Sequence, residues 1–106
     1  MVSTLENWQE KEFNNLLKSK KNGVVEFSAP WCGACKLIEP AILDLSKDFK
    51  NVTFAKINVS KSPGLASRMG VMSLPNILFI NGGKVIDQII GSTTKKAIQE
   101  RIKKFK

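Results

Sequence analysis

Two cysteines three positions apart are the residues of this chain whose type and spacing best suit chemistry. They are Cys32 and Cys35, and the 106-residue sequence contains no other cysteine. An apolar segment, Val24–Phe27, ends shortly before them, and a helical pattern begins at about Gly33. The thiols would then lie one turn apart at a helix N-terminus, with Cα atoms about 5–6 Å apart, so that a disulfide can close. Because a helix N-terminus favours a thiolate over a thiol, we interpret the pair as a redox centre.

The same two thiols have two other possible uses, metal binding and simple packing. A structural zinc site needs four ligands, usually cysteine and histidine, whereas this chain has two cysteines and no histidine. No metal site within one chain is therefore expected, and a metal shared across a dimer is the alternative. Two inert thiols buried in the core are the other alternative.

Length and composition are those of one globular domain, residues 1–106. The chain is 42% hydrophobic and 25% charged, which is typical of globular proteins. We expect no membrane association, because no apolar run reaches the roughly 18 residues of a membrane span. Residues 1–6 show neither the basic nor the apolar part of a secretory signal, so we expect a cytoplasmic protein. In a reducing compartment, a lone cysteine pair is more often catalytic or metal-binding than structural.

The net charge of +8 is concentrated near the C-terminus. Residues 95–106 hold six cations, and Glu100 is their only acid. A solvated helix face with cations near the helix C-terminus explains this pattern, and a docking surface for acidic partners is the alternative. We expect no nucleic-acid binding, because only two of the seventeen cations are arginines,.

The pattern of apolar residues predicts a strand before the cysteine pair and a helix after it. Strands are expected at residues 2–5, 24–28, 52–59, 76–80 and 84–90, the last two joined by a hairpin turn at Asn81-Gly82-Gly83,. Helices are expected from a capping box at Asn7 and Glu10 to about Lys20, over about 33–49 and 63–69, and from a cap at Thr93 or Thr94 onward,. The inward residues expected in the second helix are Leu37, Ile38, Ala41, Ile42 and Leu45,. The order β-α-β-α-β-α-β-β-α implies an α/β fold with a mixed sheet of about five strands and four helices on its two faces.

Within this order of elements, the segment Val25–Lys36 resembles the active-site segment of the thioredoxin family. It reads as a strand followed by Trp-Cys-Gly-x-Cys-Lys, and the match extends over nearly the whole chain, including Pro40, Leu74-Pro75 and Gly91. The resemblance implies the thioredoxin fold and a thiol–disulfide oxidoreductase that reduces disulfides of other proteins. It also implies a redox-active disulfide in place of a bound cofactor. Electrons would come from a separate reductase, because the chain has no glycine-rich nucleotide-binding turn.

The resemblance assigns a role to each group at the reacting centre. Cys32 would attack the substrate disulfide, and Cys35 would resolve the mixed disulfide. Glu26 matches a buried acid of the family, an aspartate in thioredoxins and a glutamate in isomerase-like domains, which accepts the proton of the second cysteine. Lys56 would adjust the pKa of Glu26. The alternative for Glu26 is an ordinary position on a solvated face.

The resemblance also implies a surface for an extended protein substrate. Pro75 would follow a cis peptide bond, and Leu74 before it would hydrogen-bond the substrate backbone as an added strand. An ordinary trans proline at a strand start is the alternative. Trp31, Gly33, Ala34 and Gly91 would complete a flat apolar surface. Trp31 could equally be a partly buried core residue.

Three residues depart from the family pattern. Ala34 stands where thioredoxins carry proline and the isomerases histidine, which leaves the redox potential open. Ser28 replaces a second tryptophan, so looser packing is expected there, and Asn76 replaces threonine. Glu26 and Ala34 suggest an isomerase or oxidase as the alternative function, and a non-catalytic adaptor is a third hypothesis. We expect a monomer whose partners are disulfide-containing proteins and a reductase of the thioredoxin reductase type.

Overall fold

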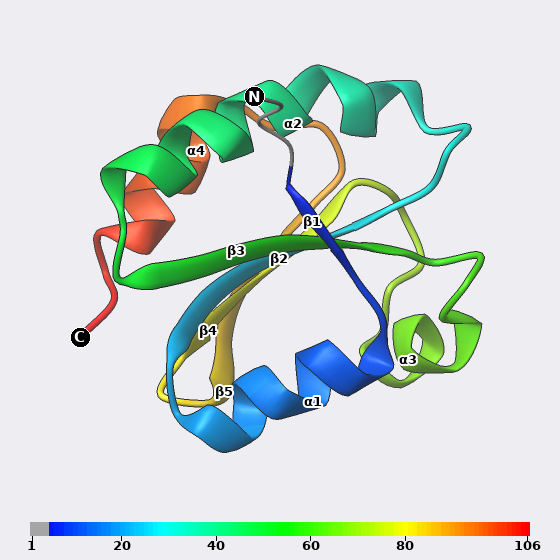
Figure 1. Cartoon of the computed structure of the whole chain (residues 1–106). Coiled ribbons are helices and arrows are strands. Elements are labelled where there is room, and N and C mark those ends of the chain that lie inside the picture. The colour runs from blue at the N-terminus through cyan, green and yellow to red at the C-terminus, as the bar shows by residue number, and fades with distance from the viewer. Residues whose placement is uncertain (1–4) are drawn as a thin grey trace.

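The computed structural model describes residues 5–106, in which one five-stranded sheet lies between two layers of helices (Figure 1). The strands are β1 (Glu6–Trp8), β2 (Asn22–Ser28), β3 (Val52–Asn58), β4 (Asn76–Asn81) and β5 (Lys84–Ile90). The helices are α1 (Glu10–Ser19), α2 (Gly33–Asp48), α3 (Pro63–Arg68) and α4 (Lys95–Ile102). This order of elements is the one that the sequence predicts.

The sheet is mixed, with β2 at its centre. Its strand order is β1-β3-β2-β4-β5. Strands β1 and β2 run parallel to β3, whereas β4 is antiparallel to both β2 and β5. Parallel neighbours need a crossover and antiparallel ones only a turn. Accordingly α2 connects β2 to β3, and a short turn connects β4 to β5 (Figure 1).

Alternate residues of β2 face the two helical layers. Val24 packs in the core beneath α2 and α4, and Val25 packs in the core beneath α1 and α3. Figure 1 shows α2 and α4 on one face of the sheet and α1 and α3 on the other. Because side chains alternate along a strand, Glu26 and Ser28 lie on the same face as Val24, the face that α2 covers.

The register places the loop that carries the cysteine pair and the loops next to β4 and β5 at one end of the strands. Phe27 of β2 lies opposite Asn76 of β4, and Asn76 lies opposite Ile90 of β5. Ser28, the last residue of β2, lies opposite Asn58, the last of β3. The segments that follow β2 and β5 and the segment that precedes β4 therefore all leave the sheet at the same end of its strands.

The first strand and the first helix differ from the prediction. The strand expected at residues 2–5 falls largely outside the described residues, and the observed strand is β1. Asn7 is extended and lies opposite Lys56 of β3, so it does not cap a helix. The capping position belongs to Gln9, whose backbone N–H donates to Oε1 of Glu12 at 2.9 Å. Pairing with a distant strand here overrides a local capping signal.

The apolar stripe of α2 is narrower than the prediction. Ile38, Ile42 and Leu45 are buried as expected, and Ala41 packs against them. Leu37, however, is 84% exposed. A neighbouring residue is rotated by about 100° around the helix axis, which turns Leu37 away from the core that Ile38 enters. The cap predicted for α4 is confirmed, because Oγ1 of Thr94 accepts a hydrogen bond from the Ala97 N–H at 3.2 Å.

Candidate active site

Cys32 and Cys35 form a disulfide at the start of α2. Their Cα atoms are 5.3 Å apart, as the spacing predicts. Cys32 is the N-cap residue, and its own N–H donates to the carbonyl oxygen of Ala29 at 3.1 Å, which shapes the turn between β2 and the helix. Cys35 is fully buried, whereas Cys32 is only partly buried. An external disulfide can therefore approach Cys32, and Cys35 is placed to react with Cys32.

The N-cap position supplies Cys32 with a hydrogen-bond donor. The backbone N–H of Cys35 donates to Sγ of Cys32 at 3.1 Å. The first N–H groups of a helix have no partner within the helix, and they carry partial positive charge. Both effects favour a negatively charged sulfur over a neutral one. The local backbone geometry thus favours a thiolate at Cys32 in a chain that contains no histidine.

Glu26 is fully buried, which rules out its placement on a solvated face. Neither carboxylate oxygen has a hydrogen-bond partner among residues 5–106. Burial raises the pKa of Glu26 to about 9, assisted by repulsion from the Glu39 carboxylate and by the hydrogen bond that protonated Glu26 can make to it. The Lys56 ammonium lowers this pKa but is the smallest of the four causes. With this pKa, Glu26 holds its proton at neutral pH.

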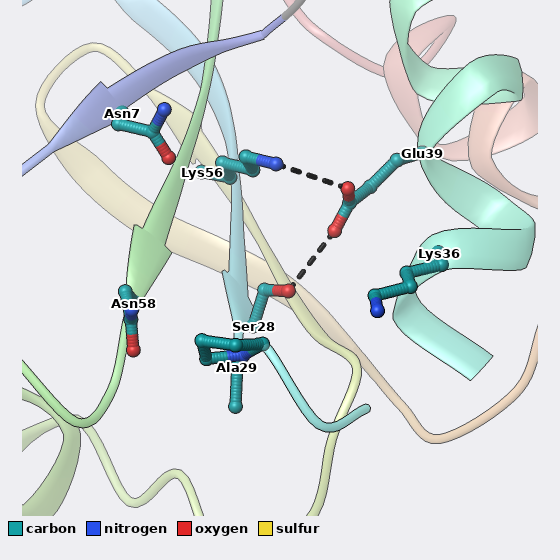
Figure 2. A pocket seen from close by; sticks show the side chains of 8 residues that line it. Asn7, Ser28, Ala29, Lys36, Glu39, Lys56 and Asn58 are labelled. Carbon is teal, nitrogen blue, oxygen red and sulfur yellow. Dashed lines mark hydrogen bonds and ion pairs between the residues drawn. The ribbon is translucent and has the colours of Figure 1, made fainter. Parts of the chain in front are cut away.

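Lys56 lies next to Glu26 in the sheet but pairs with another carboxylate. The two residues are register partners on β2 and β3. The Lys56 Nζ atom is 3.1 Å from Oε1 of Glu39, and the Ser28 hydroxyl donates to Oε2 of Glu39 at 2.9 Å (Figure 2). Lys56 is thus the register partner of Glu26, while its ammonium group pairs with Glu39; that Lys56 adjusts the pKa of Glu26 stays a prediction.

Glu39 is a charged residue of this site that the sequence analysis did not include. It lies four positions after Cys35 in α2 and is therefore on the same face of the helix. An acid directly after the buried Ile38, within an otherwise apolar stripe, is the signal that could have identified it. Glu39 helps to line a pocket of about 240 Å³ beside Ser28, where the sequence predicts looser packing. The other lining residues are Asn7, Ala29, Pro30, Lys36, Lys56 and Asn58 (Figure 2).

The peptide bond between Leu74 and Pro75 is cis, as the family resemblance implies. The carbonyl oxygen of Pro75 accepts a hydrogen bond from the Gly91 N–H at 2.8 Å. These two segments therefore meet at the end of the sheet from which the Cys32 loop also leaves. Ala34 contributes to a small hollow of about 100 Å³ together with Ser92 and Thr93. The first turn of α2 therefore lies beside the segment that follows Gly91.

Apolar side chains are exposed around this end of the sheet. Trp31 is 71% exposed, which excludes a core position, and Gly33 is exposed as well. Leu37, Met72 and Ile90 are also exposed, and sequence reasoning did not include them in the surface. Large exposed apolar groups that gather in one region are typical of interaction sites.

Comparison with known proteins shows the family of this chain. The thioredoxin family profile matches residues 4–104, so the chain belongs to the thioredoxin family. It is 39% identical to chloroplastic thioredoxin M4 of Arabidopsis thaliana, over 92% of this chain and 49% of that protein. It is 40% identical to a thioredoxin of Chlorobaculum thiosulfatiphilum, over 82% of each. The oxidised mitochondrial thioredoxin 3 of Saccharomyces cerevisiae superimposes with a TM-score of 0.86 at 32% identity, over 93% of each chain.

The family and the cysteine pair together make this chain a thiol–disulfide oxidoreductase with a redox-active disulfide. Thioredoxins act on disulfide substrates, are reduced by reductases and need no bound cofactor. The chain spans about half the length of the Arabidopsis relative. Within residues 5–106, no helix is long and apolar enough to cross a membrane, and no group of three or more histidine, cysteine or acidic side chains could hold a metal ion.

Proposed function

We propose that this chain reduces disulfide bonds in other proteins, with Cys32 as the attacking residue and Cys35 as the resolving residue. The observation that carries the proposal is the asymmetry of the disulfide. Cys32 is partly accessible and accepts a helix N–H at its sulfur, whereas Cys35 is fully buried one turn along α2. An accessible, activated thiol beside a protected one is what two-step exchange requires.

Reduction takes place in two exchanges. First, the thiolate of Cys32 attacks one substrate sulfur; the bond between Cys32 and that sulfur forms, the substrate disulfide breaks, and the other substrate sulfur leaves as a thiolate that is protonated by water. Next, Cys35 loses its proton and attacks Sγ of Cys32, which forms the Cys32–Cys35 disulfide and releases the remaining substrate sulfur. Two electrons pass to the substrate, and the disulfide in this structure is the product state.

Glu26 would carry the proton of Cys35. As Cys35 attacks, the Glu26 carboxylate accepts its proton, directly or through water, and Glu26 ends in the protonated form. A pKa of about 9 for Glu26 in the oxidised protein is consistent with that form at neutral pH. When a reductase reopens the disulfide, the same carboxyl group returns the proton to Cys35. Lys56 would adjust the pKa of Glu26.

The end of the sheet beside the cysteine pair would hold the substrate. Leu74, which precedes the cis bond to Pro75, would hydrogen-bond an extended substrate segment. Trp31, Gly33, Ala34 and Gly91 would form the surface around it. The exposure of Trp31 and the hydrogen bond between Gly91 and Pro75 support this arrangement.

The partners that we propose are disulfide-containing proteins and a thioredoxin reductase-type enzyme that supplies electrons. We further propose a monomer that works in a reducing compartment such as the cytoplasm, because a lone cysteine pair there serves chemistry more often than stability. Fractionation of cells that carry the full chain tests the compartment, since enrichment in an organelle or outside the cell would contradict it. Light scattering tests the monomer.

Turnover on insulin disulfides tests the proposed reaction. The reaction is driven first by a nicotinamide-dependent reductase and then by a small dithiol. The unmodified chain should turn over in both cases. Cys32→Ser should be inactive, whereas Cys35→Ser should accumulate a covalent adduct with an insulin chain that intact-mass spectrometry detects. Turnover by the Cys32→Ser protein would overturn the proposal, and full biological activity of the double serine variant would favour an adaptor.

An oxidase or isomerase is the second candidate, favoured by the buried Glu26 and by Ala34 between the cysteines. The two functions differ in the equilibrium of the Cys32–Cys35 disulfide with glutathione. A reductase holds its disulfide against a large excess of reduced glutathione, whereas an oxidase gives it up readily. An equilibrium constant with glutathione that corresponds to an oxidising disulfide would therefore reverse our proposal.

A further inference from the structure

Glu39 occupies the place where α2 meets the ends of the two central strands. Its carboxylate reaches across the pocket to Lys56 on β3 and to Ser28 at the end of β2 (Figure 2). Its side chain is 17% exposed and that of Lys56 is 28% exposed, so the ion pair is largely shielded from water. A charge pair in such surroundings is stronger than one on the open surface.

Lys56 lies near two carboxylates, those of Glu26 and Glu39, and pairs with Glu39. As register partners on neighbouring strands, Glu26 and Lys56 project from the same face of the sheet,. The Lys56 ammonium nevertheless lies 3.1 Å from Glu39, and the Glu26 oxygens have no hydrogen-bond partner among the described residues. The Lys56 ammonium thus pairs with Glu39, while Glu26 makes no ion pair within residues 5–106.

Three charged side chains are among the described residues that line the pocket beside Glu39. Lys36 and Glu39 come from α2, and Lys56 comes from β3. On its other side, Glu26 lies opposite the apolar Ile77 of β4. Of these charged side chains, Lys56 is the cation that acts on Glu26, and its attraction lowers the pKa of Glu26.

We propose that Glu39 is a positioning residue of the dithiol site, which holds the Lys56 ammonium in the pocket and so prevents it from pairing with the buried carboxyl group of Glu26. The inference rests on the proposed role of Glu26 as proton carrier for Cys35. Glu39 also repels a charged Glu26 directly. Both effects keep the proton on Glu26 in the oxidised protein, ready for transfer to Cys35 when the disulfide opens.

The titration of Glu26 in variant proteins tests this proposal. The carboxyl carbon of Glu26 is followed by NMR in the oxidised protein from pH 4 to 11. Glu39→Gln keeps the size of the side chain but removes its charge and frees Lys56. The midpoint of the Glu26 titration should then fall by about 1–3 pH units, the range that a newly available opposite charge produces. Asp44→Asn is the matched control, because it removes an exposed acid from the same helix and should shift the midpoint little.

A second variant separates repositioning of Lys56 from simple loss of repulsion. Lys56→Met should raise the Glu26 midpoint more in the Glu39→Gln protein than in the parent protein, because Lys56 contacts Glu26 only after Glu39 releases it. Equal effects in the two backgrounds would mean that Lys56 does not move, and that result would overturn the proposal. A Glu39→Gln shift no larger than that of Asp44→Asn would overturn it as well.

The same variants keep this inference separate from the proposed function. The pH profile of insulin reduction should shift in Glu39→Gln in the direction of the Glu26 titration. If Glu26→Gln leaves that profile unchanged, the role of Glu26 in the reaction is wrong, although the NMR result still decides what Glu39 does to Glu26.

Discussion

The backbone N–H of Gly91 donates a hydrogen bond to the carbonyl oxygen of Pro75 at 2.8 Å, which joins the end of β5 to the residue before β4. Gly91 makes this contact with a φ angle of +87°. Residues with a Cβ atom adopt such angles at a cost of about 1–2 kcal/mol. The proposed substrate surface therefore depends on a glycine for its backbone path.

Gly91→Ala should destabilise the protein by about 1 kcal/mol because of this backbone conformation. Within the described residues, no heavy atom lies within 4 Å of an added Cβ at Gly91, so a clash does not contribute. Insulin should bind less well, while reaction with a small dithiol should change little. Urea unfolding and the KM for insulin measure the two effects.

The matched control for Gly91→Ala is Gly64→Ala in α3, where the backbone is helical. Among residues 5–106 and apart from the backbone of its own helix, an added Cβ there meets only the end of the Arg68 side chain, at 3.8 Å. Alanine is favoured over glycine in a helix by about 0.5–1 kcal/mol, so this variant should be as stable as the parent or more so. Equal losses of stability in both variants would contradict the conformational explanation for Gly91.

Glu26→Gln should stabilise the oxidised protein at neutral and alkaline pH. The folded chain holds the Glu26 proton up to a pKa of about 9, whereas the unfolded chain loses it near the ordinary value of 4.5. Between these values the folded state binds more protons, so the free energy of unfolding falls as the pH rises. Glutamine removes this pH dependence, and the free energy of unfolding at pH 9 should rise by something on the order of a few kcal/mol.

Denaturant unfolding of the oxidised parent and Glu26→Gln proteins at pH 5, 7 and 9 measures this dependence. The two stabilities should nearly coincide at pH 5 and separate progressively above it. Parallel curves at all three pH values would show that Glu26 titrates at an ordinary pKa in the folded protein.

Leu37 and Ile42 should respond differently to truncation although both lie in α2. Ile42 is fully buried, and Ile42→Ala should cost about 2–5 kcal/mol because a cavity remains in the core. Leu37 is 84% exposed, so Leu37→Ala should change stability by no more than about 0.5 kcal/mol but should weaken insulin binding. Thermal unfolding and KM separate the two roles, and a large loss of stability in Leu37→Ala would contradict the observed orientation.

The elements next to the cysteines could be predicted because their signals are local. The apolar run of β2, the start of α2 at Gly33 and the glycine turn between β4 and β5 all depend on residues close in sequence. The start of α1 could not be predicted in this way, because Asn7 is held by pairing with Lys56, 49 positions further along the chain.

The candidate site shows the same division between local and tertiary information. The spacing of Cys32 and Cys35 predicts their disulfide, and the family resemblance predicts a buried Glu26. The role of Glu39 depends on which carboxylate the Lys56 ammonium contacts, and that choice is made by the packing of α2 on the sheet. No spacing in the sequence reveals it.

The rate of alkylation of the reduced protein as a function of pH tests the central claim most directly. Iodoacetamide reacts with thiolates, and modified Cys32 and Cys35 are distinguished by peptide mass. Because Cys32 caps α2 and accepts the Cys35 N–H, its alkylation should be half-maximal well below pH 8.5, the approximate midpoint for a free cysteine. Cys35 should react more slowly at every pH. Half-maximal alkylation of Cys32 at or above about 8.5, or faster reaction of Cys35, would contradict the account.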